Sequence, residues 1–179
     1  GPGRRPSAGP DHAGIATAAG APYDPAAQPG TAMDDTRTIT TLLAAGGRRL
    51  IVGWSDGTEH DLDLSARAEA PADDSAFAQA EAGPDRVCWP AGGLIAAADL
   101  WELGLAQAAD RLIGWRTRHR LTQPQACAIL GIAERMLRNY EKRAYPIPKA
   151  ILLALDGYDA RLGLPVRPAP ERSGTPGRS

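Results

Sequence analysis

The residues best suited to recognising another molecule lie between positions 121 and 143, in the sequence LTQPQACAILGIAERMLRNYEKR. Arginine can donate two hydrogen bonds to guanine, and asparagine can pair with adenine. Arg135 and Asn139 are four positions apart, so on a helix they share one face. Further cations flank this stretch and suit phosphate contacts: Arg118, Arg120, Lys142 and Arg143. The pattern favours binding to double-stranded DNA.

Local signals predict two short helices around these side chains. Thr122 can cap a helix from Gln123 to Leu130, Gln125 can complete a capping box, and Gly131 can end the helix. A second helix is predicted from about Glu134 to Lys142, with two residues facing inward (Leu137 and Tyr140) and four facing outward (Glu134, Arg135, Arg138 and Asn139). A helical bundle with a solvated cationic face is the alternative interpretation.

The stretch WRTRHRLTQPQACAILGIAERMLRNYEKRAYPIP resembles the Cro and lambda-repressor-like helix-turn-helix domains, over about residues 110–162. The resemblance implies a five-helix, all-α domain in which Gln123 touches phosphate and is within reach of a base. It places Glu134, Arg135, Arg138 and Asn139 on the recognition helix. It also implies a structural salt bridge between Arg116 and Glu141. Adding the two cations at the end of this helix gives the predicted DNA-binding set: Gln123, Glu134, Arg135, Arg138, Asn139, Lys142 and Arg143.

Three residues depart from the pattern of this family. Cys127 occupies a tight helix crossing that usually carries alanine, and Ala133 stands where a capping Ser or Thr is common. Arg143 replaces the glycine that often ends the recognition helix, so the helix is expected to run on or to end without a left-handed residue. His119 is interpreted as a surface residue near phosphate.

Charge divides the chain into two modules. Residues 33–109 contain five arginines and thirteen acidic residues, a balance of −8, whereas residues 110–150 contain nine basic and three acidic residues, a balance of +6. The basic module holds the two predicted helices. The acidic module is a candidate surface for a basic protein partner.

The sequence of the acidic module predicts a small α+β domain. Apolar residues alternate on both sides of Asp56-Gly57, which predicts a β-hairpin with a two-residue turn. Further strands are predicted at 38–43, 86–89 and 93–95, and a short helix at 75–82. The order from the hairpin through VCWPAGGLIAAADLWEL resembles a family of small bacterial domains of unknown function that often precede a helix-turn-helix domain, over about residues 38–103.

No catalytic or metal-binding set is found, so we expect no enzyme activity and no cofactor. On a strand, His60 would point to the opposite face from Asp61 and Asp63. The tryptophans at 54, 89 and 101 are interpreted as core or domain-interface residues, and Cys88 as a small buried residue. Cys88 and Cys127 match no zinc or disulfide spacing.

These patterns predict four segments: a disordered arm (1–32), the acidic domain (33–105), a helix-turn-helix domain (106–163) and a disordered tail (164–179). The predicted fold class is an α+β N-terminal domain with a β-hairpin sheet, followed by an all-α five-helix lambda-repressor-like domain. The predicted function is that of a bacterial transcription regulator that binds DNA as a homodimer. An antitoxin-like protein-interaction module is the alternative. Without a signal peptide or an 18-residue apolar run, we expect a cytoplasmic protein with no membrane contact.

Overall fold

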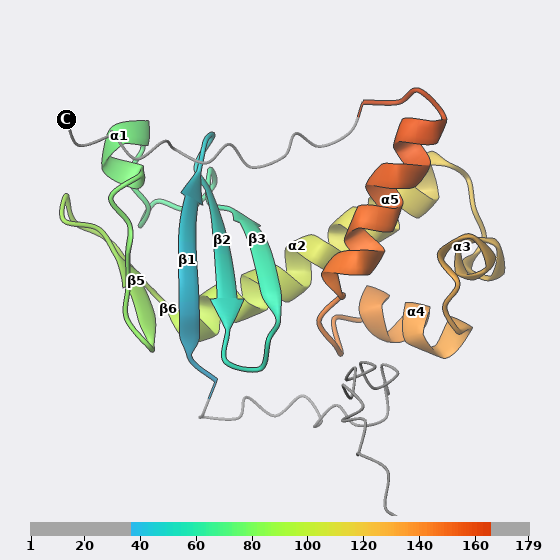
Figure 1. The fold of residues 1–179 in the computed structure, drawn as a ribbon, viewed down its shortest axis with the longest axis horizontal. Helices are drawn as coiled ribbons and strands as arrows, with labels where there is room; N and C mark the ends of the chain where they lie inside the picture. The colour runs from blue at the N-terminus through green and yellow to red at the C-terminus, as the bar shows by residue number, and fades with distance from the viewer. Residues whose placement is uncertain (1–36, 166–179) are drawn as a thin grey trace, which may run out of the picture. The chain divides into compact units, whose positions relative to one another are not determined.

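The computed structural model describes residues 37–165, so the predicted arm and all but two residues of the predicted tail lie outside the described part. In chain order its elements are β1 (Ile39–Ala45), β2 (Arg49–Trp54), β3 (Glu59–Asp63), α1 (Asp74–Phe77), β4 (Glu81–Ala82), β5 (Arg86–Cys88), β6 (Leu94–Ala96), α2 (Ala97–Arg118), α3 (Gln123–Leu130), α4 (Glu134–Glu141) and α5 (Lys149–Arg161) (Figure 1). Two antiparallel sheets form, with strand orders β1-β2-β3 and β4-β5-β6.

The predicted fold class, an α+β domain with a hairpin sheet followed by an all-α five-helix domain, is wrong. The structure has a three-stranded sheet first and then a second small sheet, whose strands β4–β6 directly precede the helices. Four helices, α2–α5, follow β6 in the described part of the chain. Because α2 begins at Ala97, immediately after β6 ends at Ala96, the strands lead into the helices without a linker.

The hairpin of β2 and β3 has the predicted alternation but a different turn. Leu50, Val52 and Leu62 are fully buried, as the period of two predicts. The turn holds three residues, 55–57, because the Trp54 N–H donates to the Thr58 carbonyl at 2.9 Å. Gly57 alone takes a left-handed conformation in this turn (φ +83°), whereas a two-residue turn of the predicted type needs positive φ at both positions.

Two further predictions for this module are corrected. The helix expected at 75–82 is limited to α1, which Asp73 caps by accepting from the Ala76 N–H at 2.8 Å. Glu81 and Ala82 instead form β4, which pairs with β5. The sequence did not predict this strand, because two residues are too few to show a periodicity. Cys88 is half-buried rather than buried, although β5 is the central strand of the second sheet, because β4 and β6 on either side are only two and three residues long.

The three tryptophans belong to the core of the front module, as predicted. Trp54, Trp89 and Trp101 are each at most 5% exposed. The rings of Trp54 and Trp101 meet edge to face with centroids 5.1 Å apart, and the indole N–H of Trp89 donates to the Phe77 carbonyl. These contacts join both sheets, α1 and the start of α2 around one core.

Helix α2 is shared by two hydrophobic cores. Its first half gives Leu100, Trp101 and Leu105 to the core beneath the sheets, and its second half gives Leu112 and Trp115 to a core formed with α3, α4 and α5. The predicted boundary between residues 105 and 106 therefore falls inside a continuous 22-residue helix.

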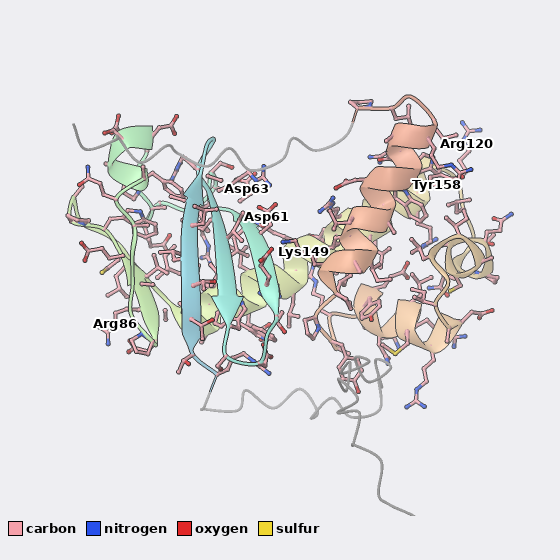
Figure 2. The ribbon with its side chains drawn as sticks, in the orientation of Figure 1. Asp61, Asp63, Arg86, Arg120, Lys149 and Tyr158 are labelled. Atoms are coloured by element: carbon pink, nitrogen blue, oxygen red, sulfur yellow. The ribbon has the colours of Figure 1, made fainter. Side chains whose placement is uncertain are left out.

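Two polar contacts link β3 to the helices. The Gln107 side chain accepts from the Asp63 N–H at 2.8 Å and donates to the Asp63 carbonyl at 2.7 Å. Lys149, at the start of α5, pairs with Glu59 at 2.6 Å (Figure 2). The Gln107 contact satisfies the backbone of Asp63, at the end of an edge strand.

Within residues 37–165, no helix is both long and apolar enough to cross a membrane. Over the same residues, no group of three or more His, Cys, Asp or Glu side chains is arranged to hold a metal ion.

His60 is a buried, neutral base in the front core. It is 3% exposed, its Nδ1 accepts from the Trp54 indole N–H at 3.2 Å, and its Nε2 has no partner among the described residues. Gly104 lies against the ring, where an added Cβ would be 2.2 Å from Nδ1. Burial lowers the pKa of His60 from 6.5 to about 4, with a smaller contribution from Arg37.

We predict that the protein loses stability as pH falls from 6.5 to 4. The unfolded chain binds a proton at His60 in this window and the folded chain does not, so the free energy of unfolding should fall by about 3 kcal/mol. Urea denaturation at several pH values measures this loss. His60→Asn, whose amide oxygen can replace Nδ1 as acceptor, should show a shallower pH dependence. A slope equal to the wild type would contradict the assignment.

Candidate nucleic-acid interface

Helix α3 begins and ends as its sequence predicts. The Thr122 hydroxyl accepts from the Gln125 N–H at 3.4 Å, and the Gln125 side chain accepts from the Thr122 N–H at 2.9 Å, which completes the capping box. Gly131 ends the helix in the left-handed conformation (φ +67°). The three-residue turn 131–133 then leads into α4.

Helix α4 has one buried face and one polar face. Leu137 and Tyr140 are at most 2% exposed and belong to one core with Cys127 of α3 and residues of α2 and α5. On the opposite side Glu134, Arg135 and Arg138 are exposed, and Asn139 is half-buried. The helix starts at Glu134, and its N-cap residue Ala133 provides no side-chain cap, as the sequence predicts. Burial of the apolar face thus fixes which side chains α4 presents outward.

The carboxylate of Glu141 joins α2, α3 and α4. One oxygen accepts from Arg116 Nε at 2.7 Å, and the other accepts from Gln123 Nε2 at 2.7 Å. Arg116 also donates to the Leu121 carbonyl at 3.2 Å. Gln123, which the sequence predicts to contact DNA, is half-buried and donates one side-chain amide N–H to Glu141. Sequence reasoning missed this contact because no pattern relates residues 18 positions apart on different helices.

The basic side chains of the predicted set differ in their internal partners. Arg138 pairs with Glu134 at 3.0 Å and Arg143 with Asp110 at 3.1 Å, and all four of these side chains are about half exposed. By contrast, Arg135, Asn139 and Lys142 form no side-chain hydrogen bond or ion pair with another described residue. These three side chains remain available to a ligand.

His119 is not a surface residue, which corrects the prediction. Its side chain is 10% exposed and its Nε2 lies 2.6 Å from Asp159 Oδ1. The ring also contacts Trp115 and Tyr158. Arg118 donates to the same carboxylate, so this cation is bound within the protein rather than free for phosphate. No sequence pattern indicates this cluster, because Asp159 lies 40 positions away on α5.

Helix α4 does end with a left-handed residue, contrary to expectation. Arg143 has φ +61° and its N–H donates to the Tyr140 carbonyl, while the Ala144 N–H donates to the Asn139 carbonyl. The bonds of the terminal turn and the Asp110 ion pair hold this conformation at a residue other than glycine. A positive φ costs an arginine about 1 kcal/mol more than a glycine.

Comparisons with known proteins give one structural match. No family model and no curated protein matches the chain. The crystal structure of "Putative DNA Binding Protein NE0471 from Nitrosomonas europaea" matches with 23% sequence identity over 69% of this chain and 87% of that chain, with a TM-score of 0.32.

We predict that Arg116 and Glu141 are coupled in stability. Arg116→Ala should lower the free energy of unfolding by about 2 kcal/mol, because it leaves a carboxylate that is only 12% exposed with one partner fewer. A double-mutant cycle with Glu141→Ala, measured by chemical denaturation, should give a coupling energy of about 1 kcal/mol or more. Arg86→Ala, which removes an exposed cation from β5, is the control. Additive losses would show that the pair contributes nothing.

Proposed function

We propose that this protein is a sequence-specific DNA-binding regulator of transcription that places α4 in the major groove. The observation that supports the proposal is the outward face of α4. Arg135 and Asn139 stand one turn apart on this face, and neither side chain is bound to another described residue. The opposite face of α4 is buried, so these side chains are held outward by the core.

The chemistry of these two side chains fits base recognition. A guanidinium can donate two parallel hydrogen bonds to the O6 and N7 atoms of guanine, and an amide can pair with the N6 and N7 atoms of adenine. Lys142, which follows the helix and is exposed, suits a phosphate contact that carries little sequence information. The excess of basic residues in the helical module supports attraction to a polyanion. In this function the chain binds DNA and carries out no catalytic step.

Two copies of α4 are needed for a long recognition site, since the helix has only eight residues. We therefore expect the protein to bind as a homodimer to half-sites about one helical turn of DNA apart. Light scattering of the protein with and without duplex measures the stoichiometry. A complex of one chain with one asymmetric duplex would contradict this expectation.

We predict different effects for residues that read bases and residues that contact phosphate. A preferred duplex is first selected from a random pool, and each variant is then titrated on this duplex and on a scrambled one. Arg135→Ala and Asn139→Ala should each cost about 1–3 kcal/mol on the preferred duplex and much less on the scrambled one. Lys142→Ala should weaken both equally and reduce the slope of log K against log salt by about 1 for each chain bound, or about 2 for the expected homodimer.

The control for general charge loss is Arg86→Ala on β5, in the front module (Figure 2). It removes the same charge as Arg135→Ala and should leave both titrations unchanged. Equal losses on the two duplexes for Arg135→Ala and Asn139→Ala would rule out base reading by α4. Undetectable binding of the wild type to every duplex at low salt would rule out the proposed function.

A further inference from the structure

Three arginines take the left-handed backbone conformation that favours glycine: Arg48 (φ +58°), Arg120 (φ +54°) and Arg143 (φ +61°). No other described residue except glycine has a positive φ. This conformation costs free energy at a residue with a Cβ. We therefore ask of each arginine what its side chain contributes in return. The three positions differ in what their side chains do.

Arg48 and Arg143 have partners within the protein. The Arg48 guanidinium donates to three backbone carbonyls, those of Ser65, Arg67 and Ala70, at 2.7–2.9 Å, and so holds the loop after β3. Arg143 pairs with Asp110, although both side chains are more than half exposed. Exposed pairs of this kind contribute little. The internal bonds of its side chain thus account for the left-handed conformation of Arg48, and those of Arg143 account for its conformation only in part.

Arg120 has no such explanation. It is exposed, and its side chain forms no hydrogen bond or ion pair with any described residue. Only its backbone has a structural role, because the Arg120 N–H donates to the Thr117 carbonyl and the Leu121 N–H donates to the Arg116 carbonyl, which closes the end of α2. Glycine would make the same two bonds without strain.

Arg120 is also close in the chain to the proposed interface. It stands two positions before Thr122, the cap of α3, beyond the end of α2 (Figure 2). The neighbouring cation Arg118 is bound to Asp159, whereas nothing in the described residues neutralises Arg120. A guanidinium without an internal partner, placed just after the hydrogen-bonded end of α2, suits a phosphate oxygen.

We propose that Arg120 is a DNA-phosphate contact, so that the nucleic-acid surface extends from α4 to the junction of α2 and α3. This inference rests on the proposed function and adds to it a contact outside helices α3 and α4. It explains why a residue that is unfavourable for the backbone stands at this position. Arg120 thus contributes affinity without sequence preference and lowers the stability of the folded chain.

Three variants separate the backbone from the charge. Arg120→Gly removes both the strain and the cation, Arg120→Gln removes only the cation, and Arg120→Lys keeps the charge. Arg120→Gly should raise Tm by about 2–4 °C, whereas Gln and Lys should leave Tm unchanged. Gly and Gln should each lower the salt slope by about 0.9 for each chain bound, or about 1.8 for the expected homodimer. At 0.1 M salt, with 1 M salt as the reference, this is about an eightfold loss of affinity for each chain. The loss should be equal on the preferred and scrambled duplexes, and Lys should keep most of the affinity.

The outcomes distinguish this inference from the proposed function. If the wild type binds duplex DNA but Arg120→Gly and Arg120→Gln keep its affinity and salt slope, Arg120 is not a contact and the function of α4 still stands. A lower Tm for Arg120→Gly would also overturn the inference, because it would show that the arginine stabilises the fold. If the wild type binds no duplex, the proposed function itself fails.

Discussion

One helix, α2, contributes side chains to both hydrophobic cores of the described residues. Within one rigid 22-residue helix, Leu105 belongs to the front core and Ala108, less than one turn later, belongs to the back core. Leu105 and Leu112, which lie on either side of this point, are both buried, and each buried side chain of this size contributes about 2–3 kcal/mol. Gln107, between the two sets, bonds to the backbone of Asp63 and so aligns the helix with the first sheet.

The orientation of α4 depends in turn on a single carboxylate. Leu137 and Tyr140 set which face of α4 is buried, but apolar packing alone is not directional. Glu141 adds direction, because its two oxygens accept from Arg116 on α2 and Gln123 on α3 at defined distances. The outward positions of Arg135 and Asn139 follow from this junction, which lies within two turns of both residues. A role for Gln123 in holding α3 also accounts for its half-buried position.

Sequence reasoning succeeded where the signal was local and failed where it was not. The capping box at Thr122, the left-handed Gly131 and the inward Leu137 and Tyr140 were predictable because each depends on residues within a few positions. The fold class was not, because β4 has only two residues and α2 starts without a linker after β6. The bond between His119 and Asp159 joins residues 40 positions apart, and the left-handed Arg143 runs against the preference of its own residue type.

The departures from local preference are concentrated around α3 and α4. Ala133 leaves the start of α4 without a side-chain cap, and Arg120 and Arg143 occupy left-handed helix ends where glycine is favoured. In the front module, the comparable departure at Arg48 is offset by three bonds to backbone carbonyls. Natural sequences usually break local rules where function requires it and compensate elsewhere. The absence of internal compensation at Arg120 and Ala133 therefore points to the ends of α2, α3 and α4 as the part of this chain shaped by a requirement other than folding.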